Sequence, residues 1–431
     1  MKETRYDRLD ESLYAETLDN GLSVFVLPKS DFRQTYATFT TRYGSIDTEF
    51  AVPGRGQKVT VPDGVAHFLE HKMFEEERGD VFLDFARYGA QANAFTTFDT
   101  TSYLFSATGH VEESLKILLD FVQHPYFTEE SVEAEKGIIG QEIRMYEDDP
   151  RWRVYFGLLQ GMYGSHPAAI DIAGTVKSIA KINKDILYDC HATFYHPSNM
   201  VLFVVGPVDP QRMAEVVREN QAPKGYVRQA PIDRLVPEVP ETIASPHVEV
   251  RLTVAEPIVN FGWRERDVPA DGRARQVQEM AMEVGLEVIL GKGSPILRKL
   301  VEDGLTDLGF SASYELTPHY GHSLIGGNSK RPRELVDRVQ AALATVGRQG
   351  VDAEAFARVK RMAMGRFLGL LDSPATVANI YTASLLHGED LFATLDLLEG
   401  LTVDDVQTAL SRHVRESEAV VSIVWPRDAS A

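Results

Sequence analysis

Residues 129–150 read EESVEAEKGIIGQEIRMYEDDP, and residues 353–374 read AEAFARVKRMAMGRFLGLLDSP. Each stretch has the composition of a long helix, and each ends in acidic residues followed by a proline, which cannot continue a helix. Similarity at a spacing of roughly 220 residues is typical of a duplicated unit. The two stretches therefore predict that the chain contains two copies of one α+β domain.

The segments around the two helices repeat in the same order. An amphipathic helix is predicted before each of them, VEESLKILLDFVQ at residues 111–123 and PRELVDRVQAALATV at residues 332–346. An apolar strand closes each half, NMVLFVVG at residues 199–206 and AVVSIVWP at residues 419–426. The shared order of helix, helix and strand strengthens the prediction of a duplication.

A change of texture separates the two halves. Residues 222–246 contain five prolines and little apolar periodicity, as expected of a linker. We therefore expect one domain at residues 1–222, a linker at residues 223–246 and a second domain at residues 247–431.

Composition excludes several classes of protein. Of the 431 residues, 44% are hydrophobic and 25% charged, which is ordinary for a globular protein, and no apolar run approaches the roughly 18–20 residues of a membrane span. The net charge of -19 would repel nucleic acid. The start MKETRYDRLDESLY lacks the apolar core of a secretion signal, and the single cysteine, Cys190, fits a reducing compartment. We expect a cytoplasmic protein with neither nucleic acid nor membrane as a partner.

The sequence His67-Phe68-Leu69-Glu70-His71 carries the chemistry of the first half. On a helix, positions 67, 70 and 71 share one face. Two imidazoles one turn apart can bind the same zinc ion, and the carboxylate between them is then placed to take a proton from water. The alternative is a pair of histidines with satisfied hydrogen bonds on a helix, beside a solvated glutamate.

A third metal ligand is expected on the helix at residues 129–150. Glu135 and Glu142 stand seven residues apart and so point the same way on this helix. Ile138 and Ile139 lie between them, from which we expect that this face packs inward, and carboxylates on a partly buried face favour a cation. The alternative is a heptad-spaced charge pair on a solvated helix.

The order H-x-x-E-H, followed by E-x6-E on a later helix, resembles the pitrilysin/insulinase metallopeptidases. The resemblance covers most of the chain and includes further segments: Asn20-Gly21-Leu22, Gly44-Ser45, Gly89-Ala90-Gln91-Ala92-Asn93-Ala94-Phe95-Thr96 and Phe194-Tyr195-His196-Pro197-Ser198-Asn199-Met200. Within that family the chain is most similar to the bacterial half-length, processing-peptidase-like branch. The resemblance implies two homologous domains, one catalytic and one inert, each with a mixed, mostly antiparallel sheet packed with helices.

The same resemblance assigns roles to the site residues. It implies one Zn²⁺ per chain, held by His67, His71 and Glu142. Glu70 would be the general base that activates water, and Glu135 would be a supporting carboxylate that orients the site. The interval of 71 residues between His71 and Glu142 is a little shorter than is usual in the family.

The family also binds substrate along a strand that corresponds to residues 92–95. An extended peptide would gain main-chain hydrogen bonds there by adding a strand, which selects short or unfolded substrates. Asn93, Ala94 and Phe95 are therefore the expected substrate contacts. The alternative is an ordinary strand with a polar residue facing outward.

The second half departs from the family pattern. Residues 296–307 resemble the segment where self-sufficient members place an arginine and a tyrosine that bind substrate, yet the matching positions hold Val301 and Asp307. Either Arg298 with Tyr314 or Tyr320 supplies these groups, or a homologous subunit does so in a heterodimer. We favour the heterodimer and keep a homodimer as the second choice.

These observations predict a zinc metalloendopeptidase that cleaves short or unfolded peptides. Two alternatives stay open: a catalytically silent binding or assembly subunit, and a zinc-dependent hydrolase of a substrate other than a peptide. The intact set of two histidines and three glutamates argues against the silent subunit.

Overall fold

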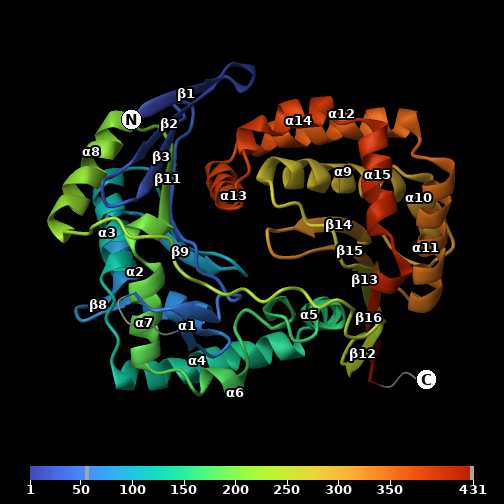
Figure 1. The fold of residues 1–431 in the computed structure, drawn as a ribbon, viewed down its shortest axis with the longest axis horizontal. Coiled ribbons are helices and arrows are strands. Elements are labelled where there is room, and N and C mark those ends of the chain that lie inside the picture. The colour runs from blue at the N-terminus through green and yellow to red at the C-terminus, as the bar shows by residue number, and fades with distance from the viewer. Residues whose placement is uncertain (54–57, 428–431) are drawn as a thin grey trace. The chain divides into compact units, whose positions relative to one another are not determined.

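The computed structural model describes residues 1–53 and 58–427, which divide into two compact units. Unit 1 comprises residues 1–143, 171–236 and 368–386, and unit 2 comprises residues 144–170, 237–367 and those from 387 onward (Figure 1). No helix in the described part of the chain is long and apolar enough to cross a membrane.

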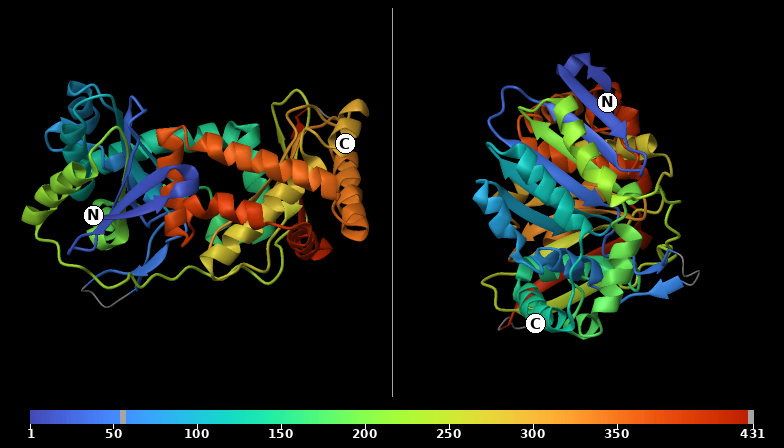
Figure 2. Two further views of the ribbon diagram at one scale, coloured as in Figure 1. Left: turned by 90° about the horizontal axis from the view of Figure 1, so that it is seen from above. Right: turned by 90° about the vertical axis from the view of Figure 1, so that its left-hand side faces the viewer.

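Unit 1 contains a sheet of seven strands. Their spatial order is β1 (Lys2–Tyr6), β2 (Glu11–Thr17), β3 (Ser23–Pro28), β11 (Met200–Gly206), β4 (Thr35–Thr41), β10 (Thr101–Ala107) and β9 (Gln91–Thr96). Only the β3–β11 pair is parallel, and all others are antiparallel. Figure 2 shows these strands side by side, with green β11 among the blue N-terminal strands. Every residue of β4 and β11 is buried, because both are central and covered on both faces.

Helices and small hairpins surround this sheet. The helices are α1 (Val65–Lys72), α2 (Val81–Arg87), α3 (Val111–Gln123), the greater part of α4 (Glu129–Asp148), α6 (Val176–Ile179), α7 (Lys184–Phe194), α8 (Pro210–Gln221) and α13 (Pro374–Leu386). The hairpins are β5 (Glu49–Ala51) with β6 (Lys58–Thr60), and β7 (Glu75–Glu76) with β8 (Gly79–Asp80). Short 3₁₀ helices occur at Asp7–Leu9, Pro197–Asn199 and Ala222–Lys224.

Unit 2 repeats the central part of this design. Its sheet has the order β12 (His247–Leu252), β16 (Ala419–Pro426), β13 (Ile258–Trp263), β15 (Gly321–Asn328) and β14 (Ser311–Leu316). The parallel pair β12 and β16 corresponds to β3 and β11, and in each unit the last strand of the half lies between a parallel and an antiparallel neighbour. The predicted α+β class with two homologous domains is therefore confirmed.

Six helices of the described chain lie wholly in unit 2, and a seventh lies there except for its last residues. They are α5 (Pro150–Tyr163), α9 (Gly272–Leu290), α10 (Pro295–Glu302), α11 (Pro332–Gln349), α14 (Thr394–Gly400), α15 (Val403–His413) and, apart from its last residues, α12 (Ala353–Leu370). Short 3₁₀ helices occur at Pro167–Ala169, Leu391–Ala393 and Glu416–Glu418.

The two halves of the sequence exchange one helix each. Helix α5, from the first half, packs on β16, β13 and β12 of unit 2. A Cβ atom at Gly157 would lie 2.4 Å from Ser422 Oγ, so glycine is required for this close approach to β16. Helix α13, from the second half, packs on β11 and β4 of unit 1 (Figure 1), where the Tyr381 ring lies 4.7 Å from that of Phe203.

The first part of the predicted linker is held against unit 1. Ala51 N donates to Asp233 O and Leu235 N donates to Glu49 O, each at 2.8 Å. Between them, the Arg234 guanidinium lies 3.2 Å from Asp47, whose pKa is raised to about 6, chiefly by burial. The compact units thus combine segments from both sides of the linker, while the boundaries at residues 222 and 246 stay a prediction.

Candidate metal centre

Helix α1 begins at a close contact between two stretches of backbone. Gly64, which caps the helix, has φ +90°, and a Cβ atom there would lie 2.5 Å from Ala173 O. Only glycine meets both demands without strain. Phe68 and Leu69 are fully buried, which anchors one side of α1 in unit 1 and leaves the histidine-bearing face toward α4.

The three predicted metal ligands converge between α1 and α4. His67 Nε2 lies 3.7 Å from Glu142 Oε1, and His71 Nε2 lies 3.6 Å from Glu142 Oε2. The ligand atoms of His67, His71 and Glu142 all lie within 4.8 Å of one another. The spacing of i and i+4 on α1 brings the two imidazoles together, with ring centroids 4.6 Å apart.

This donor set fits a zinc ion. Around a four-coordinate zinc, ligand atoms are separated by about 3.3–3.5 Å, so the two distances from Glu142 to the histidines are already close to those required. Burial lowers the pKa of His67 to about 4, which keeps the imidazole in the neutral form that can bind a metal. The buried Nδ1 of His67 has no hydrogen-bond partner within the described residues. Two imidazoles and one carboxylate are the ligand set of many catalytic zinc sites.

Glu135 contacts the far side of His71. Its Oε1 lies 3.0 Å from His71 Nδ1, so a proton on Nδ1 is donated to Glu135 and the Nε2 lone pair faces Glu142. Burial acts to lower the pKa of His71, but the hydrogen bond to Glu135 and the nearby carboxylates raise it overall. Glu135 therefore contacts the ring on the side away from Glu142, which is where a supporting carboxylate would lie.

One expectation about α4 is wrong in part. Ile139 is fully buried, but the neighbouring Ile138 is 57% exposed. Successive residues on a helix differ by about 100° in direction, so Ile138 and Ile139 flank the two glutamates on opposite sides, and only the side of Ile139 is covered. Glu135 and Glu142 are partly buried because α1 covers them, whereas Ile138 remains open to solvent.

Glu70 is buried and hydrogen-bonded to a residue that sequence reasoning did not assign to the site. Thr96 Oγ1 donates to Glu70 Oε2 at 2.6 Å. Burial raises the pKa of the Glu70 carboxyl, and the bond from Thr96 opposes this effect. A carboxyl group with a raised pKa beside a candidate metal site suits proton transfer near neutral pH. The only signal of Thr96 in the sequence is its place directly after Asn93-Ala94-Phe95.

The predicted substrate contacts lie on β9, which is an edge strand. It pairs with β10 on one side, with Ala94 opposite Tyr103, and among the described residues no strand pairs with its other side. Ala94 N donates to the side-chain Oδ1 of Asn93 at 2.9 Å, so this N–H faces away from β10. Phe95 is half-buried, and helix α1 packs against β9. The expected contacts thus lie on a free sheet edge beside the helix that carries His67 and His71.

The two positions of unit 2 that depart from the family pattern hold Val301 and Asp307 in place of an arginine and a tyrosine. Val301 is half-buried in α10, and Asp307 is exposed and accepts a bond from Gly309 N at 2.7 Å. Both candidate tyrosines are buried and already donate to carboxylates: Tyr314 to Glu265 and Tyr320 to Glu315, each at 2.8 Å. Neither hydroxyl is available to a substrate without breaking its bond.

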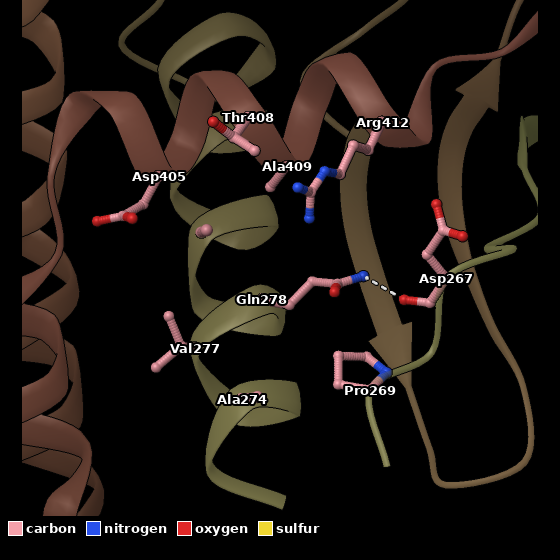
Figure 3. Close-up of a pocket in the computed structure, with 10 residues that line it drawn as sticks. Asp267, Pro269, Ala274, Val277, Gln278, Asp405, Thr408, Ala409 and Arg412 are labelled. Atoms are coloured by element: carbon pink, nitrogen blue, oxygen red, sulfur yellow. Dashed lines mark hydrogen bonds between the residues drawn. The ribbon is translucent and has the colours of Figure 1, made fainter. Parts of the chain in front are cut away.

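A cavity of about 270 Å³ lies between α9 and α15 of unit 2 (Figure 3). Gln278 crosses it and donates to Asp267 O at 3.4 Å, and Arg412 extends from α15 toward the same space. Its ten lining residues include no histidine and none of the predicted site residues. The cavity therefore shares no residue with the cluster formed by α1 and α4.

Two family models match the chain. The model described as Insulinase (Peptidase family M16) matches residues 60–176, which contain the cluster, and the model described as Peptidase M16 inactive domain matches residues 181–363. The inert second half expected from the sequence agrees with the second description.

Curated and solved relatives give the same assignment over the whole chain. The uncharacterized zinc protease YmfH of Bacillus subtilis is 44% identical, over 99% of this chain and all of its own. The uncharacterized zinc protease ML0855 of Mycobacterium leprae is 25% identical, over 89% of this chain and 87% of its own. The crystal structure of a putative M16-like peptidase from Alicyclobacillus acidocaldarius matches with a TM-score of 0.93 and 42% identity, over 96% of this chain and 98% of its own. On these grounds the chain belongs to peptidase family M16, the insulinase family.

Proposed function

We propose that this protein is a zinc-dependent endopeptidase that cleaves short or unfolded peptides. The observation that carries the proposal is the convergence of His67, His71 and Glu142, with the Glu70 carboxyl on the same face of α1. Several relatives are named zinc proteases, which agrees with this proposal.

The residues divide the chemistry among them. His67, His71 and Glu142 would hold one zinc ion, which when bound would polarise the scissile carbonyl and acidify water. Glu70 takes the proton of the attacking water and returns it to the leaving amine. Glu135 keeps the His71 ring in its metal-facing orientation through the 3.0 Å contact with Nδ1.

Substrate would bind along β9. The outward N–H of Ala94 can donate to an added peptide strand once the Asn93 side chain releases it. Such pairing needs an extended backbone, so folded proteins are excluded and short or unfolded chains are accepted. Asn93, Ala94 and Phe95 are the residues that would contact it.

We infer that a homologous partner subunit completes the site. The pattern of Val301 and Asp307, and the existing bonds of Tyr314 and Tyr320, support a partner as the source of the arginine and tyrosine. An oxyanion that develops in the reaction is stabilised by donors, and an ionised Asp307 would repel it. A self-sufficient homodimer is the second choice, and a cytoplasmic location stays a prediction.

The variant Glu70→Gln tests the mechanism. Glutamine keeps the size of the side chain but cannot take a proton, so zinc content should be unchanged while kcat falls by at least about 100-fold. Glu77→Gln, an exposed change shortly after α1, is the matched control and should retain full activity. Turnover by the Glu70 variant at the normal rate would show that the assigned base is wrong.

Native mass and metal content test the assembly. The complex should be purified gently and its chains and zinc counted. One zinc in a pair of unequal chains supports the heterodimer, and two in a symmetric pair support the homodimer. A zinc-free complex without turnover would favour a silent binding subunit, and turnover of only non-peptide substrates would favour another kind of hydrolase.

A further inference from the structure

The hydroxyl of Thr96 has a single proton, and its neighbours determine where that proton goes. Glu70 Oε2 lies 2.6 Å from Thr96 Oγ1, and Thr101 Oγ1 lies 3.4 Å away on the adjacent strand β10. Thr101 gives its own proton to Tyr43 O at 2.8 Å. The Thr96 proton is therefore directed at Glu70, because this is the shorter contact and the carboxylate is the stronger acceptor.

This bond fixes the orientation of the Glu70 carboxyl group. A glutamate side chain has a broad terminal torsion, so its oxygens are poorly oriented without a partner. Thr96 holds Oε2, while the other oxygen, Oε1, has no hydrogen-bond partner within the described residues. One oxygen is thus anchored, and the other remains for a water molecule.

Thr96 also belongs to the strand that would bind substrate. It is the last residue of β9, two positions after Ala94, whose N–H faces the free edge of the sheet. Since N–H groups of alternate residues in a strand point the same way, a peptide added along this edge would extend toward Thr96. The hydrogen bond from Thr96 to Glu70 therefore links the orientation of the Glu70 carboxyl to the position of β9.

We propose that Thr96 is a positioning residue, whose hydroxyl holds the general base in its productive orientation and ties it to the substrate-binding strand. This inference rests on the proposed peptidase function. Thr96 acts through Glu70 and does not itself contact the reacting atoms.

Three variants of the purified complex test the proposal. Thr96→Val removes the hydroxyl and keeps the β-branched shape, and Thr96→Ser keeps the hydroxyl. Thr40→Val is the matched control, because Thr40 Oγ1 makes a buried 2.7 Å bond to Ser102 Oγ in the same sheet without contacting Glu70. For each variant we would measure zinc content, kcat and KM on an unstructured peptide, and a metal-free crystal structure.

The expected result is specific to the hydroxyl. Thr96→Val should lower kcat by about 10- to 100-fold with little change in KM or zinc content, as is usual for groups that orient a catalytic residue. Thr96→Ser should recover most of the rate, and Thr40→Val should retain it. In the crystal structure, the Glu70 carboxyl should be displaced in Thr96→Val and unmoved in Thr96→Ser.

Two results would overturn the proposal. One is a Thr96→Val variant with normal kcat and an unmoved Glu70, and the other is a Thr96→Ser variant as impaired as Thr96→Val. If the zinc-loaded wild type cleaves no peptide, the peptidase function fails. The position of Glu70 in the crystal structures still decides whether Thr96 orients it.

Discussion

The Nδ1 atom of His71 lies 3.0 Å from Oε1 of Glu135, on the side of the ring opposite to Glu142. Glu135 and Glu142 are separated by two turns of α4, so one helix contacts both nitrogens of a single imidazole. These two contacts orient the ring with Nδ1 toward Glu135 and Nε2 toward Glu142.

The first prediction is that Glu135→Gln weakens zinc binding. The neutral amide accepts the Nδ1 proton less strongly, so zinc affinity should fall by about 10- to 100-fold in competition with a chelator. Glu133→Gln, an exposed change on the same helix, should leave affinity unchanged. Equal affinities for both variants would mean that Glu135 does not orient His71.

The second prediction concerns the stability that zinc confers. At a zinc concentration of 100 times Kd, the free energy of unfolding should rise by about 2.7 kcal/mol, because only the folded site binds the metal. Calorimetry should show a higher Tm with zinc and its reversal by a chelator. Glu142→Ala should lose this response, whereas Glu130→Gln, exposed on the same helix, should keep it.

The third prediction concerns the free edge of β9. Ala94→Pro removes the outward N–H, so substrate should lose one main-chain hydrogen bond and KM should rise several-fold, equivalent to about 1 kcal/mol. Ala94→Ser retains the N–H and serves as the control. An unchanged KM for the proline variant would place the substrate elsewhere.

The fourth prediction is a pH dependence of stability in unit 2. Burial raises the pKa of Glu279 to about 8 from an unfolded value near 4.5. The nearby charges of Glu389, Glu283 and Glu315 add to this effect, and that of His387 opposes it. The folded state therefore holds a proton that the unfolded state loses between these values. The contribution of this proton to the free energy of unfolding is fully present below pH 4.5 and is lost as pH rises through 8.

The variant Glu279→Gln should remove this dependence. Because glutamine stays neutral, the variant should be more stable than wild type at pH 8.5, by about 1–2 kcal/mol for a partly screened group, and similar to it at pH 4.5. Denaturant titrations at both values would measure the difference. Glu354→Gln, exposed on α12, is the control, and a gain that is equal at both pH values would contradict the assignment.

Local patterns in the sequence were sufficient for much of the fold. The predicted helix at residues 111–123 coincides with α3, and the repeated strands at the end of each half are β11 and β16. These elements follow from periodicity and from helix-ending residues, which are read within a few turns. The pairing of His67 with His71 was predictable for the same reason.

Contacts between distant segments were beyond this reasoning. The bond between Thr96 and Glu70 joins a strand end to a helix 26 residues earlier, and no spacing rule indicates it. Likewise the apolar composition of α13 favours a buried helix, but it does not indicate that β11 and β4 are its partners. Glu142 was assigned through family resemblance, because its approach to α1 depends on how the whole of α4 packs.

The reciprocal exchange of α5 and α13 means that neither half of the sequence is a complete folding unit. Residues 1–236 alone would lack Tyr381, and the rings of Phe25 and Phe203 in the first sheet would lose their covering partner. The arrangement is a domain swap within one chain. A break in the linker should therefore yield two fragments that fold only when they are mixed. In this respect the intact chain resembles a domain-swapped dimer whose two subunits are covalently joined.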